Sequence, residues 1–539
     1  MTDKKAVKKV TKKKVTKASS ENAITVSATP EGNTADNGNV LTLSYVREGA
    51  RGEFRGDFTR DTFNPMDRFS RVLMQQGRVQ LDADWNEQNS IILHYLRNLA
   101  CDVGSEHWGP KVGAGFEIMG SEGSGEKKLF ICPGHYYVNG ILCVADLDQD
   151  GNLLNYSNQS DYPLPPGESI QDIDPKIISG QVSALVYLDV WERHFTYIND
   201  DSMREVALGG PDTATRAKII WQVKILPVPF EAIPTPTSGI SQLKEKYKYF
   251  LNLIQAEIKP GKGMLCAKAK DKADDNNDPC LVAPESRYRG AENQLYRVEI
   301  HNSGTASIVG GDVNASGATF KWSRENSSVI FPITDIQDTL VSLEHLGKDY
   351  RYGLKPNDWV EVIDDDYVLQ CLAEPLLQVE SIDEENRQIT LKSPSGSTTG
   401  TDPSKHPYLR RWDHKDGDEN GIAVQENLEG ELWLELEDGI QVQFKGGNEA
   451  SITDVNSYTF EVSAIYQTGD YWLIPARTVT GDIEWPEDAG QPQALLPHGV
   501  VHHYAPLAIL NKGQDNDGDG SDDGGDNIDL RRILIQTWV

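Results

Sequence analysis

From residue 128 onward, short β-forming segments alternate with turn-forming residues, and this alternation is what most limits the fold of the chain. The clearest case is 128–146, where two β-rich arms flank Asn139-Gly140. An Asn-Gly pair accepts the positive φ angles of a tight turn, so the segment predicts a β-hairpin. Further strands are predicted at 182–198, 217–228, 296–300, 319–322, 359–363, 376–382, 388–391, 431–436, 440–444, 457–465 and 471–474. The expected fold class is mainly β, with several sandwich-like or barrel-like domains.

One segment departs from the β pattern and predicts a single prominent helix near the N-terminus, over 84–103. Asp84 is placed to cap this helix, and Glu87 follows three residues later, close to the reciprocal capping pattern. Gly104 is expected to end the helix. Apolar residues recur at helical spacing on one face of it: Trp85, Ile92, Leu96, Leu99 and Val103. A second helical piece is expected at 241–255.

Composition divides the 539 residues into a polar N-terminal extension and three predicted domains. Residues 1–45 are rich in Lys, Thr, Ala, Ser and Asn and predict a disordered basic extension, because such a segment cannot bury a core. The length of the chain suits about three or four domains. We expect a helix-plus-β assembly domain over 46–228, a middle β domain over 229–395, and a C-terminal β domain with an acidic Asp/Gly loop over 396–539.

Charge is distributed unevenly along the chain. Residues 1–20 contain eight Lys and one acidic residue, Asp3, which gives about +7. Since the whole chain carries a formal −30, the remainder carries about −37. A body this acidic repels nucleic acid and anionic lipid, so we expect no nucleic-acid partner, and membrane contact only through an assembly. The basic arm is expected to be a solvated tail; contact with a polyanion or an acidic neighbouring subunit is the alternative.

Neither a membrane helix nor a signal peptide is predicted. The apolar runs are far shorter than the ~20 residues that a membrane helix requires, and no apolar stretch follows the basic N-terminus. Six Cys are scattered without a CxxC motif, so no zinc ribbon or redox pair is indicated. Small buried thiols are expected, with Cys132–Cys143 and Cys266–Cys280 as candidate bridges. We therefore expect a protein that is made in the cytoplasm.

The sharpest local motif is the acidic loop from Asp515 to Asp526. It fits a twelve-residue calcium loop in which Asp515, Asp517 and Asp519 supply oxygens, Gly520 permits the sharp turn and Asp526 closes the loop. Asp at position twelve is shorter than the usual bidentate Glu, and the flanks do not predict a helix pair. The motif therefore predicts either a structural calcium site or a solvated acidic surface loop.

Other chemical signatures are weak. His498, His502 and His503 lie close together and could hold zinc or nickel, but no acidic or Cys partner recurs at ligand spacing, so packing and hydrogen bonding are favoured. No nucleophile elbow, P-loop, G-x-G-x-x-G loop or H-E-x-x-H helix is present. A glycosidase pair stays open, because its two carboxylates can come from distant strands.

Several blocks of sequence resemble a bacterial family built on a domain of unknown function. They are FTRDTFNPMDRFSRVLMQQGRVQLDADWNEQ (58–88), PGHYYVNGILC (133–143), LDVWERHFTYI (188–198), REVALGGPDTATRAKIIWQVK (204–224), YRVEIHNSG (296–304), TFKWSRENSSV (319–329), LRRWDH (409–414) and TGDYWLIPARTVTGDIEWP (468–486). Members of the family tend to be encoded among components of phage-tail-like contractile injection systems. The first two blocks are also similar to the N-terminal region of phage baseplate and tail-fibre proteins.

The resemblance implies a structural, non-enzymatic subunit that forms trimers or six-fold-related oligomers. Such a subunit would be baseplate-associated, or part of a fibre or cage, and would contact baseplate, sheath or spike proteins within a phage-like particle. Two alternatives remain at this point: a calcium-dependent carbohydrate-binding or adhesive protein, and a glycan hydrolase.

Overall fold

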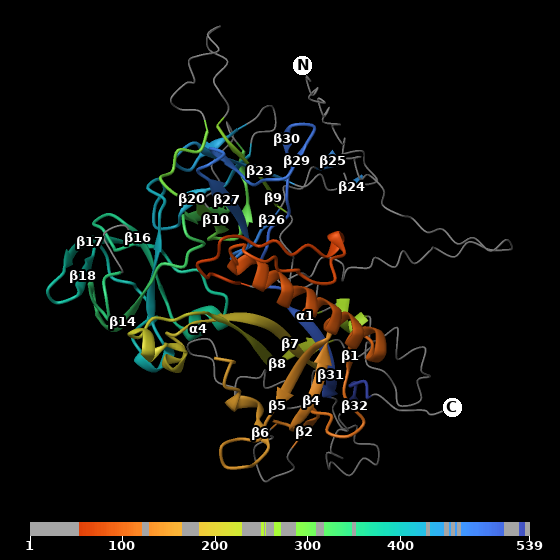
Figure 1. Cartoon of the computed structure of the whole chain (residues 1–539). Helices are drawn as coiled ribbons and strands as arrows, with labels where there is room; N and C mark the ends of the chain where they lie inside the picture. Colours follow the sequence, from red (N-terminus) through yellow and green to blue (C-terminus); the bar gives the residue numbers. More distant parts are fainter. Residues whose placement is uncertain are drawn as a thin grey trace, which may run out of the picture. The chain divides into compact units, whose positions relative to one another are not determined.

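The computed structural model of this chain confirms the mainly β fold class (Figure 1). It describes residues 53–120, 129–163, 183–228, 249–252, 254, 263–270, 287–308, 317–347, 352–426, 432–446, 452–453, 459–460, 465–510 and 528–533. These residues all belong to one compact unit, Val46–Val539. The predicted basic extension and most of the predicted helix at 241–255 lie outside the described residues.

The predicted N-terminal helix is present as α1 (Asp82–Gly104), and it ends at Gly104 as expected. It begins two residues earlier than predicted, because Leu81 is the residue before its first turn. Asp84 therefore lies inside that turn, where its carboxylate accepts a hydrogen bond from the Leu81 N–H at 3.3 Å, and it is not the cap itself. The other helical elements with described bounds are short: α4 (Asp365–Leu369) and the 3₁₀ turns η2 (Pro65–Asp67), η3 (Tyr156–Asn158), η5 (Asp201–Met203), η6 (Val206–Leu208) and η8 (Pro403–Lys405). The described residues of the predicted helix at 241–255, 249–252 and 254, are helical as well.

The predicted hairpin is confirmed as β4 (Gly134–Val138) and β5 (Ile141–Ala145). Asn139 and Gly140 form its turn with φ angles of 46° and 76°, the left-handed conformation that this residue pair tolerates. β1 (His107–Trp108) extends the hairpin to a three-stranded sheet. A second three-stranded sheet contains β2 (Ile118–Gly120), β3 (Leu129–Ile131) and β6 (Leu154–Asn155).

A four-stranded sheet combines two long strands from the first half of the chain with two strands from its C-terminal part. β7 (Ser183–Phe195) and β8 (Arg216–Val228) pair along their whole length. β31 (His503–Leu510) pairs with the other edge of β7, and β32 (Ile528–Asp529) pairs with β31. The inner faces of these strands and of the β4–β5 hairpin share one hydrophobic core, which includes Tyr136, Val190 and Leu507.

A larger sheet forms the second core. Its five strands, in spatial order, are β20 (Ile422–Ala423), β13 (Thr319–Ser323), β10 (Gln294–Ile300), β27 (Tyr471–Arg477) and β28 (Asp482–Ile483). Its core, with Val298, Phe320 and Trp472, also contains side chains of a sheet of β22 (Leu434–Glu435), β23 (Ile440–Lys445) and β9 (Met264–Ala269). Two-stranded ladders complete the set: β11 (Gly304–Thr305) with β26 (Ile465–Tyr466), β12 (Ser307–Ile308) with β21 (Gln425–Glu426), β24 (Ile452–Thr453) with β25 (Thr459–Phe460), and β29 (Glu487–Asp488) with β30 (Gln491–Pro492).

A closed barrel forms the third core. Its strands, in order around the barrel, are β14 (Ile330–Gln337), β15 (Leu340–Leu343), β18 (Gln388–Leu391), β17 (Leu377–Asp383), β16 (Trp359–Ile363) and β19 (Tyr408–Trp412). Closure pairs the strand edges with each other, which removes unpaired backbone groups. The barrel interior is filled by aliphatic and aromatic side chains such as Phe331, Val360 and Leu409.

The sheets combine strands from different predicted domains. β31 comes from the predicted C-terminal domain and pairs with β7 of the predicted N-terminal domain, and β27 pairs with β10 across the predicted boundary at 395/396. The boundaries themselves stay predictions. Cys132 and Cys143 are free thiols and do not bridge each other, and Cys371 is a free thiol as well. Cys280 lies outside the described residues, so the candidate bridge Cys266–Cys280 stays a prediction. Among the residues that the structure describes, no helix is long and apolar enough to cross a membrane.

Candidate functional site

The predicted calcium loop cannot be placed: Asp515, Asp517, Asp519 and Asp526 all lie outside the described residues. Within the described part of the chain, no group of three or more His, Cys, Asp or Glu side chains is arranged to hold a metal ion. The calcium site and its alternative, a solvated acidic loop, therefore stay predictions.

The three neighbouring histidines contact different partners. His502 Nδ1 lies 2.7 Å from a carboxylate oxygen of Asp189. Burial lowers the pKa of His502, but the charge and hydrogen bond of Asp189 outweigh it and raise that pKa to about 9. His503 receives a hydrogen bond from Asn139 at 2.8 Å, which ties β31 to the hairpin turn. The ring of His498 lies against that of Tyr471. The expectation of packing and hydrogen-bonding histidines fits these contacts.

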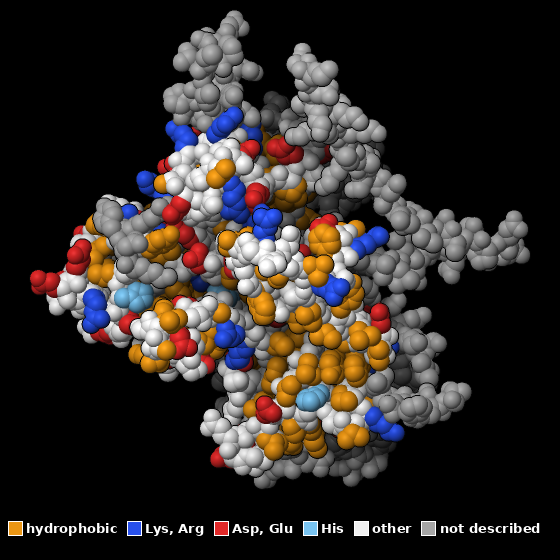
Figure 2. Space-filling model, in the orientation of Figure 1, with side chains coloured by type: hydrophobic (Ala, Val, Ile, Leu, Met, Phe, Trp, Pro, Cys, Tyr) orange, Lys and Arg blue, Asp and Glu red, His pale blue; other side chains and the backbone are white. Residues whose placement is uncertain are grey.

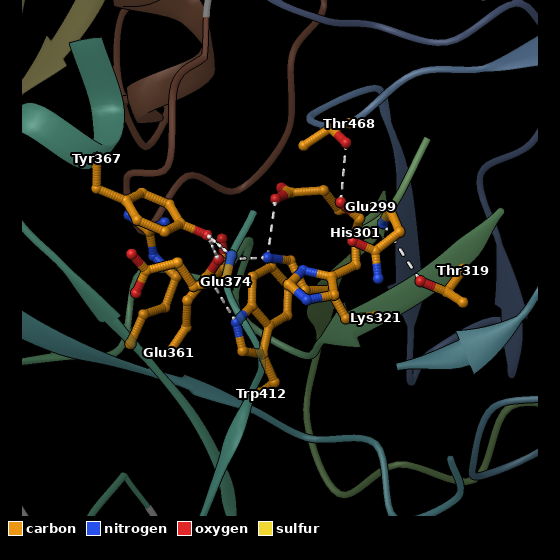
Figure 3. Close-up of polar contacts among 12 residues, drawn as sticks. Glu299, His301, Thr319, Lys321, Glu361, Tyr367, Glu374, Trp412 and Thr468 are labelled. Carbon is orange, nitrogen blue, oxygen red and sulfur yellow. Dashed lines mark hydrogen bonds and ion pairs between the residues drawn. The ribbon is translucent and has the colours of Figure 1, made fainter. Parts of the chain in front are cut away.

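A buried charge network, which the sequence did not predict, connects the five-stranded sheet to the barrel. Lys321 of β13 lies between two carboxylates (Figure 3): its Nζ is 2.7 Å from Glu361 of β16 and 3.7 Å from Glu299 of β10. Glu361 also accepts hydrogen bonds from Tyr367 at 2.6 Å and from Trp412 at 2.9 Å. Both glutamates and the lysine are 3% exposed, so these interactions form away from solvent.

The same network holds the segment at the start of the described chain. Arg55 forms an ion pair with Glu299 at 2.6 Å, and Arg297 donates to the same carboxylate at 2.6 Å. Asn326 donates to the carbonyl oxygens of Phe54 and Gly56 at 3.2 and 3.0 Å. Residues 53–57 are therefore held against β10 and the turn that follows β13, and Arg55, which makes the central contact, is 7% exposed.

The electrostatics of this network favour structural over acid–base chemistry. Burial alone would raise the pKa of Glu361, but Lys321 outweighs it and lowers that pKa to about 2. Glu299 is likewise held well below its ordinary pKa, because Arg55 and Arg297 outweigh the effect of burial. A glycosidase acid needs a carboxyl group with a raised pKa. Neither of these two carboxylates therefore has the raised pKa that a glycosidase acid needs.

The second candidate site is a surface. The most apolar side of α1 faces away from the rest of the protein. Five residues of one stripe are 47–62% exposed: Trp85, Ile92, Leu96, Leu99 and Val103. The buried residues of the helix are Ala83, Ser90 and Ile91. At 3.6 residues per turn, these buried residues lie on the opposite side from the stripe. An amphipathic surface helix normally buries its apolar stripe, so the orientation of α1 is reversed.

Contacts on the other side of the helix fix this orientation. The Trp108 indole donates to the Ala100 carbonyl at 3.1 Å, and Arg97 forms an ion pair with Glu192 at 2.9 Å. The backbone of Arg97 closes over the hairpin turn at Gly140, where a Cβ atom would lie 2.4 Å from the Arg97 carbonyl oxygen. Rotating the helix to bury its stripe would break all of these contacts.

The segment 59–81 runs beside α1 and adds further exposed apolar side chains. Thr59 donates to Asp82 through its N–H at 2.9 Å and its hydroxyl at 2.5 Å, and the Val72 N–H donates to Gln88 at 2.9 Å. Six side chains of the segment are more than 40% exposed: Met66, Phe69, Leu73, Met74, Val79 and Leu81. In the view of Figure 2, hydrophobic side chains are spread along α1 and gather below it, in the region of β1, β4 and β5.

Seven exposed residues of the helix together form the apolar face of α1: Trp85, Ile92, Leu93, Tyr95, Leu96, Leu99 and Val103. The sequence identified the stripe but not its exposure. One sequence feature indicates the buried charges. Glu299 in β10 and Glu361 in β16 each lie at the centre of an apolar strand, and a charged residue in such a position needs a buried partner.

Comparison with known proteins gives one match. The chain matches the family of unknown function DUF6519 over residues 54–231 and 244–518. No curated protein and no solved structure matches it. The two matched segments contain the apolar face of α1, the buried charge network and the barrel. Because they cover well over half of its length, the chain belongs to the DUF6519 family.

Proposed function

We propose that this chain is a structural, non-enzymatic subunit of a phage-tail-like contractile injection system, either baseplate-associated or part of a fibre or cage. The observation that carries the proposal is the apolar face of α1, which contacts on the opposite side of the helix hold outward. Large exposed apolar patches mark interaction surfaces in soluble proteins. The kind of particle rests on the sequence resemblance of blocks such as 58–88 and 133–143.

The apolar face of α1 is large enough for a stable interface. Its side chains are about half exposed, so each offers on the order of 100 Å², and the seven together about 700 Å². The segment 66–81 adds six more side chains of similar exposure. A standard protein–protein interface buries about 800 Å² per partner, whereas the largest patch on a typical monomer is about 300–600 Å². The surface therefore has the area of an interface.

The spacing along α1 suggests what covers this face. Positions 85, 89, 92, 96, 99 and 103 alternate steps of four and three, which is the a/d spacing of a coiled-coil seam. Asn89 falls at an a position, where a single Asn fixes the register and the oligomeric state of a coiled coil. A seam of this kind is self-complementary. We therefore take α1 of further copies as the occupant, in a trimer or a six-fold-related oligomer.

The proposal is tested by fractionating a lysate of the native host by sedimentation, probing for this chain and imaging the heavy fractions by electron microscopy. The wild-type chain should travel with sheathed, tail-like particles. A variant with Leu96→Asp and Leu99→Asp should stay at the top of the gradient although it folds, because both side chains are exposed in the single chain. A wild-type chain that stays at the top as a monomer overturns the proposal.

Two other outcomes would point to the alternative functions. Glycan binding by a monomer that is lost with EDTA would favour a calcium-dependent carbohydrate-binding protein. Turnover of a glycan that a single carboxylate substitution abolishes would favour a hydrolase. Either result, obtained without particle association, would replace the structural role.

A further inference from the structure

One exposed cysteine lies next to a histidine that is paired with a carboxylate. Cys371 follows α4 closely, and its thiol is free and exposed. The thiol is a hydrogen-bond partner of His502, whose Nδ1 lies 2.7 Å from a carboxylate oxygen of Asp189. Because Nδ1 faces the carboxylate, Nε2 is the nitrogen left for the sulfur. The three side chains therefore follow one another in the order that activates a nucleophile: thiol, imidazole, carboxylate.

Three distant parts of the chain build this arrangement. β31 pairs with β7, which brings His502 against Trp191 with ring centroids 4.7 Å apart. Leu369, the last residue of α4, belongs to the same buried cluster as Trp191 (Figure 1). The start of α4 is tied to β7 as well, because Arg193 donates to Asp365 at 2.5 Å. The cysteine that follows α4 is thus held beside the histidine.

The groups around His502 keep its imidazolium protonated at neutral pH. Burial would raise the pKa of Asp189, but His502 and Lys224, whose Nζ lies 2.7 Å away, outweigh it and lower that pKa. Burial lowers the pKa of His502, but Asp189 and the thiol outweigh it and raise that pKa to about 9. Tyr504 and His503 are neutral neighbours, because burial raises the pKa of Tyr504 and lowers that of His503 to about 4. A positive imidazolium beside a thiol favours the thiolate.

The charges that line a small cavity beside Cys371 balance one another. The cavity has a volume of about 60 Å³ and borders the buried charge network. Among the described residues, its wall holds three cationic and three anionic side chains: Arg55, Lys321, Arg410, Glu53, Glu299 and Glu361. Their charges cancel by count, so His502 supplies the net charge beside the sulfur. The exposed side of Cys371 is open to a reagent from solvent.

The backbone around Cys371 distinguishes between the reactions of an activated thiol. The N–H of Cys371 donates to the Val368 carbonyl at 3.3 Å, and the N–H of Leu372 donates to the Tyr367 carbonyl at 3.1 Å. Acyl transfer would need such N–H groups for the oxyanion of a tetrahedral intermediate, and both are already used. Attack on a disulfide forms no oxyanion and needs only a thiolate and a leaving group.

We propose that Cys371 is a covalent modification site, at which His502 and Asp189 activate the thiol to form a mixed disulfide with a low-molecular-weight disulfide. The Cys371 thiolate attacks one sulfur of the disulfide, so a new S–S bond forms while the old one breaks. The displaced sulfur leaves as a thiolate and takes the proton from the His502 imidazolium. The disulfide is itself the oxidant, so the step is balanced. The modification is stoichiometric and independent of the apolar face of α1.

The test incubates the folded full-length chain with oxidised glutathione at about pH 6 and quantifies the mixed disulfide at Cys371 by peptide mass spectrometry. At this pH an unassisted thiol is almost fully protonated. His502→Gln should therefore slow the modification at least about fivefold. His135→Gln removes a different histidine, exposed on β4, and should leave the rate unchanged.

Two further measurements separate activation of the sulfur from access to it. At about pH 6 the wild type should react more slowly in guanidinium chloride than in its native state, because the unfolded thiol is more accessible but has lost His502. At about pH 10 the folded wild type and His502→Gln should react at equal rates, since thiols are then largely deprotonated and His502 is neutral.

Three results would overturn the proposal. The first is a native wild type that reacts at about pH 6 no faster than the unfolded chain. The second is a folded His502→Gln variant that reacts as fast as the wild type at this pH. The third is a difference between the two folded chains that persists at about pH 10, because it would show that His502 controls access to the sulfur and not its protonation.

Discussion

Two adjacent isoleucines of α1, one buried and one exposed, allow a matched test of the interface. Ile91 is 2% exposed and packs against the protein, whereas Ile92 is 47% exposed on the apolar face of α1. Ile91→Ala should lower the free energy of unfolding by about 2–5 kcal/mol, as for other buried isoleucines. Ile92→Ala should change it by less than about 0.5 kcal/mol, because most of this side chain contacts water in the single chain.

When association is measured, Ile92→Ala should have the larger effect and Ile91→Ala the smaller one. Burying a whole isoleucine side chain is worth about 1.5–3 kcal/mol, so the exposed half of Ile92 offers about 1 kcal/mol per subunit. In a trimer three copies lose this contribution, so Ile92→Ala should weaken assembly by about 3 kcal/mol, a factor of about one hundred.

Sedimentation equilibrium gives the association constant, and denaturant unfolding of the dissociated chain gives the stability. If Ile92→Ala lowers the stability of the chain as much as Ile91→Ala does, then Ile92 is buried within its own chain, and the assignment of this surface to an interface is refuted. If Ile92→Ala leaves both quantities unchanged, the face is exposed but unused.

Three further predictions concern other parts of the chain. The pKa of His502 is raised to about 9 by Asp189, so its contribution to stability is complete below pH 6.5 and is lost as the pH rises through 9. Denaturant unfolding between these pH values should show that the free energy of unfolding falls more steeply with pH for the wild type than for His502→Gln. Arg55→Met should lower the free energy of unfolding by about 3–5 kcal/mol, since it leaves Glu299 short of a partner, and the cost in the double variant with Glu299→Gln should be less than additive. If the acidic loop holds calcium, the ion should raise the melting temperature, and EDTA or Asp515→Asn should abolish the increase.

Much of the fold could be predicted from local sequence. The strands and the hairpin are encoded by β-forming runs and by the Asn139-Gly140 turn, and 359–363 and 388–391 coincide with β16 and β18. The partners of the strands could not be predicted in this way. β31 pairs with β7 although about 300 residues separate them in the chain, and no local pattern encodes such a contact.

The two candidate sites show different limits of sequence reasoning. Periodicity located the stripe that contains Leu96 and Leu99, but a period alone does not show whether a stripe faces the core or a partner. The decisive features are contacts made elsewhere, through Arg97 and Trp108. In β10 all seven residues are buried, so both faces of the strand are covered and the alternation that normally identifies an inward charge is absent.

The most direct test of the central claim is disulfide cross-linking through the seam of α1. A Leu99→Cys variant, prepared with exposed Cys371 replaced by Ser, is oxidised in purified particles and analysed on a non-reducing gel. Because Leu99 occupies a d position of the proposed seam, copies of the chain should join covalently through residue 99. The same substitution at the exposed position Asp150, outside α1, should not cross-link. If chains with Cys at 99 stay monomeric under oxidation while the particles remain intact, α1 does not meet α1 of another copy, and the proposed assembly is contradicted.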